Sequence, residues 1–266
     1  MSNILQTLAE ATRARVLAEE RLQPLAQVRA QALAMPVRAD FPFEQTLATP
    51  GVALICECKK ASPSKGLIAP DFPYVTIAKE YERGGAAAIS VLTEPQWFLG
   101  SDAYLGEIAE AVSIPCLRKD FTVDAYMIYR AKVLGASAVL LICAITPPEQ
   151  LREWVTLCDA LGLSALVETH SEVEIDMALQ AGARVIGVNN RDLTNFTVDT
   201  GQSTRLRGLV PPGILFVAES GIRTPTDVAA LGAAGVDAVL VGEALMRAPD
   251  RVAAVQRMRG MTPSAT

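Results

Sequence analysis

A pattern that occurs four times in the sequence limits the folds that this chain can adopt. Each copy has a break of small residues, including glycine, followed by an apolar run of β-forming residues. The copies are RGGAAAISVL (83–92), VLGASAVLLI (133–142), QAGARVIGVN (180–189) and AAGVDAVLVG (233–242). Glycine after a helical pattern is the usual helix stop, so each copy predicts a helix end, a tight turn and a buried strand. The copies recur about every 50 residues, which is room for two βα units.

Four further apolar runs fall between these copies. They are VALICE (52–57), IPCLRKD (114–120), LSALVE (163–168) and ILFVAE (214–219). Continuous apolar runs are typical of strands covered on both faces, as in a parallel sheet wrapped by helices. Helical patterns with prolines or capping residues at their starts occupy 147–161, 171–182 and 224–235; the second has Ser171 and Glu174 at capping-box spacing.

Eight strands that alternate with helices predict an α/β fold, a (βα)8 TIM barrel, with an open doubly wound sheet as the weaker alternative. The segment before the first strand has an amphipathic stretch over 4–22, an interruption at Pro24 and a turn-rich stretch over 34–43. We therefore expect an N-terminal helical extension over 1–50 that packs on the barrel. Residues 51–266 are expected to form the barrel as a single catalytic domain.

Composition excludes several classes of protein. Half of the 266 residues are hydrophobic and the net charge is -5, which argues against a nucleic-acid or membrane-surface binder. The five cysteines form no C-x-x-C pair, so we expect buried free thiols and no metal site. The N-terminus lacks a secretion signal, and the longest apolar run, AVLLICAI (138–145), is too short for a membrane span. We expect a soluble, cytoplasmic protein.

Charged residues end alternate strands of the predicted barrel. The first, third, fifth and seventh strands end in Glu57, Lys119, Glu168 and Glu219. Each inward-facing layer of such a barrel takes its side chains from alternate strands, so these four groups are expected to meet at the mouth, where active sites of this fold lie. Lys59, two residues beyond Glu57, is expected to point the same way. Packed together, these groups shift one another's proton affinities, as acid–base chemistry requires.

The last two strands predict a phosphate site. Loops after the seventh and eighth strands, together with a helix N-terminus, form the usual phosphate cradle of this barrel. Glu243 follows the glycine that opens the last short helix, and we expect its side chain to point away and its backbone N–H to face the ligand. The other expected contacts are Ser220, Gly221, Gly242 and Arg191, with Lys59 and Ser62 from the first loop.

Aromatic residues near the same rim predict an apolar wall. Trp97 and Phe98 follow the second strand, and Phe121 follows the third. Together they suggest a planar or apolar part of the substrate opposite the phosphate, although a core position is at least as common for such residues. His170, the only histidine, is interpreted as a rim residue, because neither a cysteine nor a serine can be argued to pair with it.

Seven motifs, taken in order, resemble those of the indole-3-glycerol phosphate synthase family, which closes the indole ring in tryptophan biosynthesis. They are ECKKASPSKG, ISVLTE with WFLGS, LRKDF, LVETH, GVNNRDL, VAESGI and LVGEALM. The resemblance covers nearly the whole chain from about residue 50. Trp97 stands where a second phenylalanine is common in the family.

The resemblance implies a carboxy-lyase that converts 1-(o-carboxyphenylamino)-1-deoxyribulose 5-phosphate into indole-3-glycerol phosphate, with loss of carbon dioxide and water. Lys119 resembles the general acid, and Lys59 would meet the substrate carboxylate or act as a second acid. Glu57 and Glu168 resemble the acid–base carboxylates, while Glu219 and Asn189 would hold the lysines and the ribulose hydroxyls. The reaction implies neither a metal nor a cofactor, since the ring cation is its own electron sink.

Two other functions remain open at this point. One is a Schiff-base aldolase, which would use Lys119 or Lys59 as its nucleophile, or another phosphosugar enzyme on the same barrel. A non-catalytic barrel would only bind a phosphorylated metabolite, but binding alone does not need carboxylates near an anion. In each case we expect a phosphorylated small molecule as partner, no nucleic acid, no membrane, and a monomer or weak oligomer.

Overall fold

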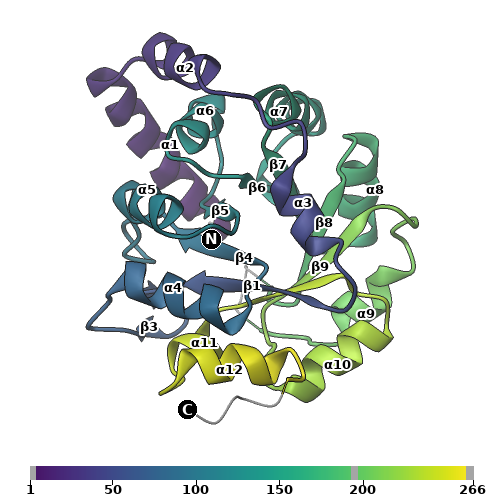
Figure 1. The fold of residues 1–266 in the computed structure, drawn as a ribbon. Helices are drawn as coiled ribbons and strands as arrows, with labels where there is room; N and C mark the ends of the chain where they lie inside the picture. The colour runs from purple at the N-terminus through teal and green to yellow at the C-terminus, as the bar shows by residue number, and fades with distance from the viewer. Residues whose placement is uncertain (1–3, 193–196, 262–266) are drawn as a thin grey trace.

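All eight predicted strands lie in one closed sheet, and helices surround it (Figure 1). The computed structural model describes residues 4–192 and 197–261. Neighbouring strands are parallel, and β1 pairs with both β4 and β10 to close the barrel. The barrel strands are β1 (Ala53–Cys58), β4 (Ala88–Leu92), β5 (Cys116–Lys119), β6 (Ala138–Ile142), β7 (Ser164–Thr169), β8 (Val185–Asn189), β9 (Leu215–Glu219) and β10 (Ala238–Val241). This closed sheet confirms the predicted (βα)8 barrel and not the alternative, an open doubly wound sheet.

The four glycine breaks form the same helix end four times. Gly85, Gly135, Gly182 and Gly235 have φ angles of 92°, 80°, 84° and 83°, which side-chain-bearing residues rarely adopt. In each case the residue after the glycine donates its N–H to the carbonyl five residues earlier, over 3.0–3.1 Å. The next strand begins three residues after each glycine. The repeat is thus a Schellman-type turn that passes the chain from the outer helices into the sheet.

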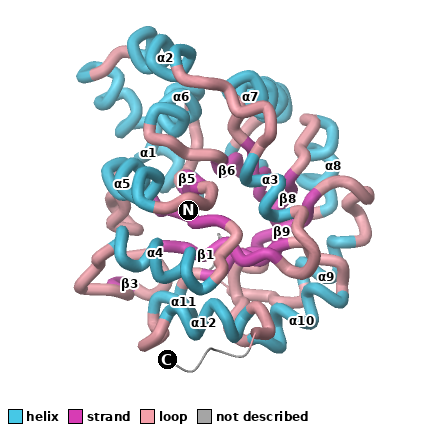
Figure 2. The backbone as a smooth tube through the Cα atoms, viewed as in Figure 1, coloured by secondary structure: helices cyan, strands magenta, loops and turns pink. Residues whose placement is uncertain are grey.

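Helices form the outer layer, and Figure 2 shows them around the central strands. Thr224 and Asp227 form a complete capping box. At the box expected from the sequence, Ser171 accepts the Glu174 N–H at 3.3 Å, but the Glu174 carboxylate accepts the N–H of His170 instead. Within the described residues, no helix has the length and apolar character needed to cross a membrane. The helices after β1 are α4 (Tyr74–Gly84), α5 (Asp102–Ala111), α6 (Ala125–Val133), the 3-10 helix η1 (Cys143–Ile145), α7 (Pro148–Leu161), α8 (Glu172–Gln180), α9 (Gln202–Arg207), α10 (Pro225–Ala233), α11 (Glu243–Met246) and α12 (Arg251–Met258).

Alternate residues of each strand face two different cores. In β1, Leu54 and Cys56 belong to the layer between sheet and helices. Ala53 and Ile55 of the same strand belong to the cluster inside the barrel. Because both faces are buried, the strands read as continuous apolar runs. All five cysteines are free and buried, as predicted.

The N-terminal extension is helical and begins beside the barrel. Its first two helices are α1 (Ile4–Leu22) and α2 (Leu25–Ala34), separated at Pro24 as expected. Leu5 and Leu8 of α1 join the inner cluster together with Phe121, which follows β5. α2 packs against α6 (Figure 1). This extension confirms the helical segment predicted before the first strand.

A third helix, α3 (Pro42–Leu47), covers the end of the barrel at which the strands begin. Its Phe43 and Leu47 are buried in the inner cluster. The Glu44 carboxylate accepts two hydrogen bonds from Arg184, at 2.8 and 2.9 Å, and one from Ser164 at the start of β7. α3 therefore covers the end at which the strands begin.

We expect Phe43→Ala to lower the free energy of unfolding by about 3–5 kcal/mol, because truncating a fully buried ring leaves a cavity. Leu33→Ala is the matched control: Leu33 is 59% exposed on α2, and its loss should cost less than about 0.5 kcal/mol. Urea denaturation of both variants measures the difference. Equal losses would show that α3 is not part of the core.

Candidate active site

A cavity of about 430 Å³ opens at the carboxyl ends of the strands. This volume is in the usual range for small-molecule sites. The four charged residues that end alternate strands all line it, as does Asn189 from β8. The predicted convergence of these side chains is therefore confirmed.

Lys119 of β5 lies between two carboxylates from alternate strands of the barrel, β7 and β9. Its Nζ is 3.5 Å from Glu168 Oε2 and 3.5 Å from Glu219 Oε2. Burial alone would lower the pKa of Lys119, but Glu219, Glu168 and Glu57 outweigh it and raise the pKa above its usual range. Lys119 is therefore an ammonium ion at neutral pH.

Glu57 and Lys59 form a second ion pair at the mouth, through Glu57 Oε2 and Lys59 Nζ. Two glycines leave room for these long side chains. A Cβ at Gly242 would collide with Glu57 Oε2 and approach Lys59 Nζ to 3.1 Å, and a Cβ at Gly187 would collide with Glu219 Oε1. The strands between the charged ones thus supply space for the charged layer.

The charges in this layer do not balance. Three carboxylates (Glu57, Glu168 and Glu219) face two ammonium groups (Lys59 and Lys119). Burial, opposed by Lys119 and reinforced by Glu168 and Glu57, raises the pKa of Glu219 to about 7. One oxygen each of Glu168 and Glu219 is buried and accepts no hydrogen bond from the described residues. Such unsatisfied acceptors are costly and typical of functional sites.

Asn189 and His170 adjoin Glu168. Asn189 donates to Glu168 Oε2 at 3.2 Å and accepts the N–H of Arg191 at 3.0 Å. His170 Nε2 lies 3.9 Å from Glu168 Oε1, but His170 does not line the cavity. Burial lowers the pKa of His170, but Glu174 and Glu168 outweigh it and raise the pKa to about 9. His170 is thus a cation behind the site, and the charge on this rim residue was not foreseen.

The residues predicted to bind phosphate also line the cavity. Ser220 has φ of 66° and Gly221 has φ of 80°, directly after β9. A left-handed serine is strained, and such strain concentrates at functional sites. The Asn190 side chain donates to the Ser220 carbonyl at 3.1 Å and supports this turn.

Cations surround the same corner. Burial lowers the pKa of Arg191, and the nearby Arg223 lowers it further, against the opposing effects of Glu243 and Glu57. The Glu243 carboxylate, at the start of the short helix α11, pairs at 3.1 Å with Arg247, the residue that follows this helix. An anion bound here would relieve the repulsion between Arg191 and Arg223. Arg223 and Arg247 were not among the predicted residues, since single arginines in loops carry no sequence signal.

The loop after β1 folds into a small hairpin beside the cavity. Its strands β2 (Ala61–Ser62) and β3 (Gly66–Leu67) are antiparallel. Ser62 lines the cavity as predicted, and Lys65 from the turn joins it. The hairpin was not predicted, because strands of two residues have no detectable periodicity.

The apolar wall differs in part from the prediction. Phe98 and Phe121 line the cavity, with ring centroids 6.1 Å apart, but the lining does not include Trp97, which packs half-buried against the inner cluster. The buried Glu94 carboxylate accepts the N–H groups of three successive residues, 96–98, at 2.7–3.0 Å, and so shapes this loop. The wall also includes residues that the sequence reading missed: Leu92, Leu140, Ile142, Ile222 and Leu240.

Two further predictions concern the GVNNRDL motif and metal binding. Leu193, the last residue of the GVNNRDL motif, lies outside the described residues. Within the described residues, no group of three or more His, Cys, Asp or Glu side chains is arranged to hold a metal ion.

Sequence comparison places the chain among known proteins. The family model for indole-3-glycerol phosphate synthase matches residues 5–258. A relative from Ruminiclostridium cellulolyticum, described as indole-3-glycerol phosphate synthase, is 51% identical over 97% of this chain and 99% of its own length. A second, from Lachnoclostridium phytofermentans and with the same description, is 49% identical over 97% of this chain and 99% of its own length.

Comparison with solved structures supports the fold alone. Thiamine phosphate pyrophosphorylase from Pyrococcus furiosus aligns with a TM-score of 0.59 at 20% identity, over 79% of this chain and 94% of that one. KGPDC from Streptococcus mutans aligns with a TM-score of 0.60 at 13% identity, over 79% and 96%. On the family match and the half-identical relatives, the chain belongs to the indole-3-glycerol phosphate synthase family.

Proposed function

We propose that this chain converts 1-(o-carboxyphenylamino)-1-deoxyribulose 5-phosphate into indole-3-glycerol phosphate, as a carboxy-lyase of tryptophan biosynthesis. One observation carries the proposal: the Lys119 ammonium is held 3.5 Å from each of two buried carboxylates inside the cavity. The apolar wall suits the aromatic ring of the substrate, and the cationic corner suits its phosphate. The same cavity thus offers a partner for each part of the molecule.

Ring closure needs an acid, because an aromatic carbon is a weak nucleophile. The carbon that bears the carboxylate attacks the ketone, and Lys119 donates a proton to the ketone oxygen as the new carbon–carbon bond forms. The surrounding carboxylates keep Lys119 charged before the step. They also stabilise the cationic ring that results, because they are buried beside it, where charges interact more strongly than in water.

Loss of carbon dioxide follows from the same intermediate. The electron pair of the bond to the carboxylate returns to the ring cation and restores aromaticity. Lys59, at the mouth, meets the substrate carboxylate before this step or acts as the second acid afterwards. The pairing of Lys59 with Glu57 supports either role, since it keeps the ammonium at the edge of the cavity.

Dehydration completes the indole. The hydroxyl formed at ring closure leaves as water after protonation, and the neighbouring carbon loses a proton to Glu57 or Glu168. Glu219 and Asn189 orient Lys119 and the ribulose hydroxyls, and the unsatisfied oxygens of Glu168 and Glu219 are available to those hydroxyls. Every proton in this sequence passes between groups that line one cavity.

The phosphate is assigned to the corner formed by the loops after β8, β9 and β10. Arg191 provides a charge-assisted contact, and the amides of Gly221 and Glu243 face a dianion without side-chain competition, since the Glu243 carboxylate is paired with Arg247. Ser220, Gly242 and, from the first loop, Ser62 complete the set.

The raised pKa of Lys119 counts against the Schiff-base aldolase. A lysine that attacks a carbonyl must be neutral, so such enzymes lower its pKa. The carboxylates around Lys119 have the opposite effect.

We further propose that the chain acts in the cytoplasm as a monomer or weak oligomer; sedimentation velocity at micromolar concentration measures the oligomeric state.

We expect Lys119→Met to lower kcat by about a hundredfold to ten-thousandfold, the usual contribution of a general acid. Substrate should still bind, because the phosphate corner and apolar wall are unchanged. Indole fluorescence measures turnover, and isothermal titration measures binding. Lys79→Met, at an exposed position on α4, is the matched control. Near wild-type turnover in Lys119→Met would refute its role as the acid.

We expect Arg191→Met and Ser220→Ala to raise KM more than they lower kcat, since they contact the non-reacting phosphate. For Arg191→Met the rise should be about tenfold to a hundredfold, the worth of one charged hydrogen bond. A substrate lacking the phosphate provides the control. Wild type should lose affinity for it, whereas Arg191→Met should show a smaller further loss. An effect on kcat alone would contradict the phosphate assignment.

We expect the stability of the wild-type protein to fall, relative to Glu219→Gln, as the pH rises. The Glu219 carboxyl has a pKa of about 7 in the folded protein, against 4.5 in an unperturbed chain. The folded state therefore holds this proton more tightly, and the stability that it contributes is lost as the pH rises from about 4.5 to 7.

Urea denaturation at about pH 5 and about pH 8 measures this difference. The gap between variant and wild type should widen with pH, on the order of 1–3 kcal/mol. Glu153→Gln, at an exposed position on α7, should show no such widening. A constant gap would mean that Glu219 does not titrate in this range.

A further inference from the structure

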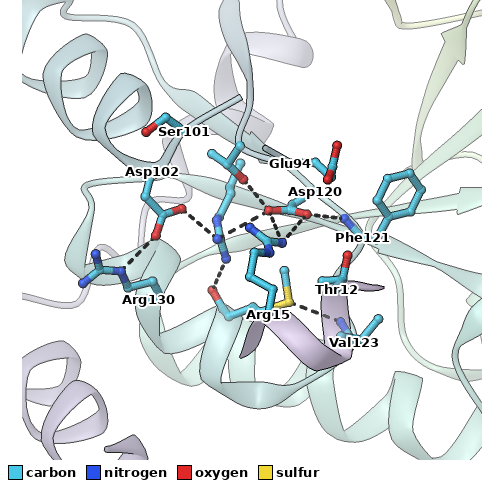
Figure 3. Close-up of polar contacts among 12 residues, drawn as sticks. Thr12, Arg15, Glu94, Ser101, Asp102, Asp120, Phe121, Val123 and Arg130 are labelled. Atoms are coloured by element: carbon cyan, nitrogen blue, oxygen red, sulfur yellow. Dashed lines mark hydrogen bonds and ion pairs between the residues drawn. The ribbon is translucent and has the colours of Figure 1, made fainter. Parts of the chain in front are cut away.

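Asp120, the residue after Lys119, has a fully buried carboxylate to which the proposed chemistry assigns no role. Figure 3 shows it at the centre of a group of polar contacts. Four donors approach it: Arg15 from α1, Thr93 after β4, the N–H of Phe121, and Arg118 of β5. A carboxylate with this many partners fixes the segments that carry them.

One of these contacts comes from the N-terminal extension. Arg15 Nη2 donates to both oxygens of Asp120, at 2.8 and 2.9 Å, across 105 residues of sequence. The Arg15 side chain is 17% exposed, so water weakens the pair only in part. Charge-assisted contacts of this kind are the stronger hydrogen bonds in proteins.

Thr93 ties the same carboxylate to the backbone of Lys119. Its hydroxyl donates to Asp120 Oδ2 at 2.6 Å, and its N–H donates to the Lys119 carbonyl at 3.2 Å. The ends of β4 and β5 are thus joined through both the side chain and the backbone. A shift of Asp120 would be transmitted to Lys119.

The residue before Lys119 is held from the helical side. Arg118 donates to Asp102 at 2.8 Å and to the Met127 carbonyl at 3.0 Å, and Asp102 also accepts from Arg130 at 3.0 Å. Figure 3 shows Arg130 and Asp102 on the side of this group away from Phe121. Ion pairs therefore hold the residues on both sides of Lys119.

The Lys119 ammonium itself is held less closely. Its two carboxylate neighbours are each 3.5 Å away, beyond the usual length of a charge-assisted hydrogen bond. Its position therefore depends on where the end of β5 lies. The position of Phe121, whose N–H donates to Asp120, also depends on where the end of β5 lies.

We propose that Arg15 is a positioning residue: through Asp120 it holds the end of β5 so that Lys119 and Phe121 face the substrate. The inference rests on the proposed function, in which Lys119 is the acid. It adds that α1 of the N-terminal extension takes part in the reaction indirectly, although α1 supplies no residue to the lining of the cavity.

The fold does not depend on Arg15. α1 keeps its buried side chains Leu5, Leu8 and Val16 without it. Asp120 keeps Thr93, the Phe121 N–H and Arg118 as partners. Arg15→Met should therefore fold, with α1 still docked, which allows its kinetics to be measured.

The test compares Arg15→Met, Arg15→Lys and wild type, with Arg13→Met as the control at an exposed position on the same helix. Single-turnover fluorescence with saturating enzyme reports the ring-forming steps, and steady-state kinetics report KM. Circular dichroism gives the folded fraction, by which each rate is divided. We expect Arg15→Met to lower the single-turnover rate about tenfold, with KM within about twofold of wild type.

Arg15→Lys keeps the charge but not the two-oxygen contact, so its rate should fall between those of Arg15→Met and wild type. Arg13→Met should match wild type. A single-turnover rate for Arg15→Met within about twofold of wild type would overturn the inference, as would a change in KM alone. If wild type itself does not convert the substrate, the proposed function fails instead, so the two failures are distinguishable.

Discussion

The site depends on the attraction between the Lys119 ammonium and the carboxylates packed around it. Charges removed from water are costly, and only close pairing offsets the cost. The mouth of the barrel holds three carboxylates against two ammonium groups. Burial, reinforced by Glu168 and Glu57 and opposed by Lys119, raises the pKa of Glu219 to about 7. Gly187 and Gly242 make the arrangement possible, because a larger residue at either position would collide with a carboxylate. Such an arrangement lowers the stability of the folded protein, as is common at functional sites.

Much of this could be predicted from the sequence, because the topology of a barrel converts sequence position into spatial position. A glycine turn followed by a strand recurs with the same geometry at Gly85, Gly135, Gly182 and Gly235. Once the strands are known, residues at their carboxyl ends must meet at one rim. Lys119 and Glu168 could therefore be placed together without any knowledge of side-chain conformations.

The rest could not be predicted, for identifiable physical reasons. Leu140 and Leu240 line the cavity but read in sequence like any other core leucine. Whether Trp97 or Phe98 faces the substrate depends on how Glu94 folds the loop through three backbone contacts. The contact between Arg15 and Asp120 spans 105 residues, and no periodic pattern selects which residue of α1 makes it. Such contacts follow from packing, which a single sequence does not display.

The extension acts at both ends of the barrel, with different consequences. At the closed end, Phe43 of α3 adds to the core, where stability is the only effect. At the mouth, Arg15 of α1 compensates the charge of Asp120 and also fixes its position. Asp120 also borders the cavity, and without its partners it would add an unpaired carboxylate to the lining. Because Arg15 and Arg118 pair with it from outside the cavity, its charge does not compete with Glu168 and Glu219 for Lys119.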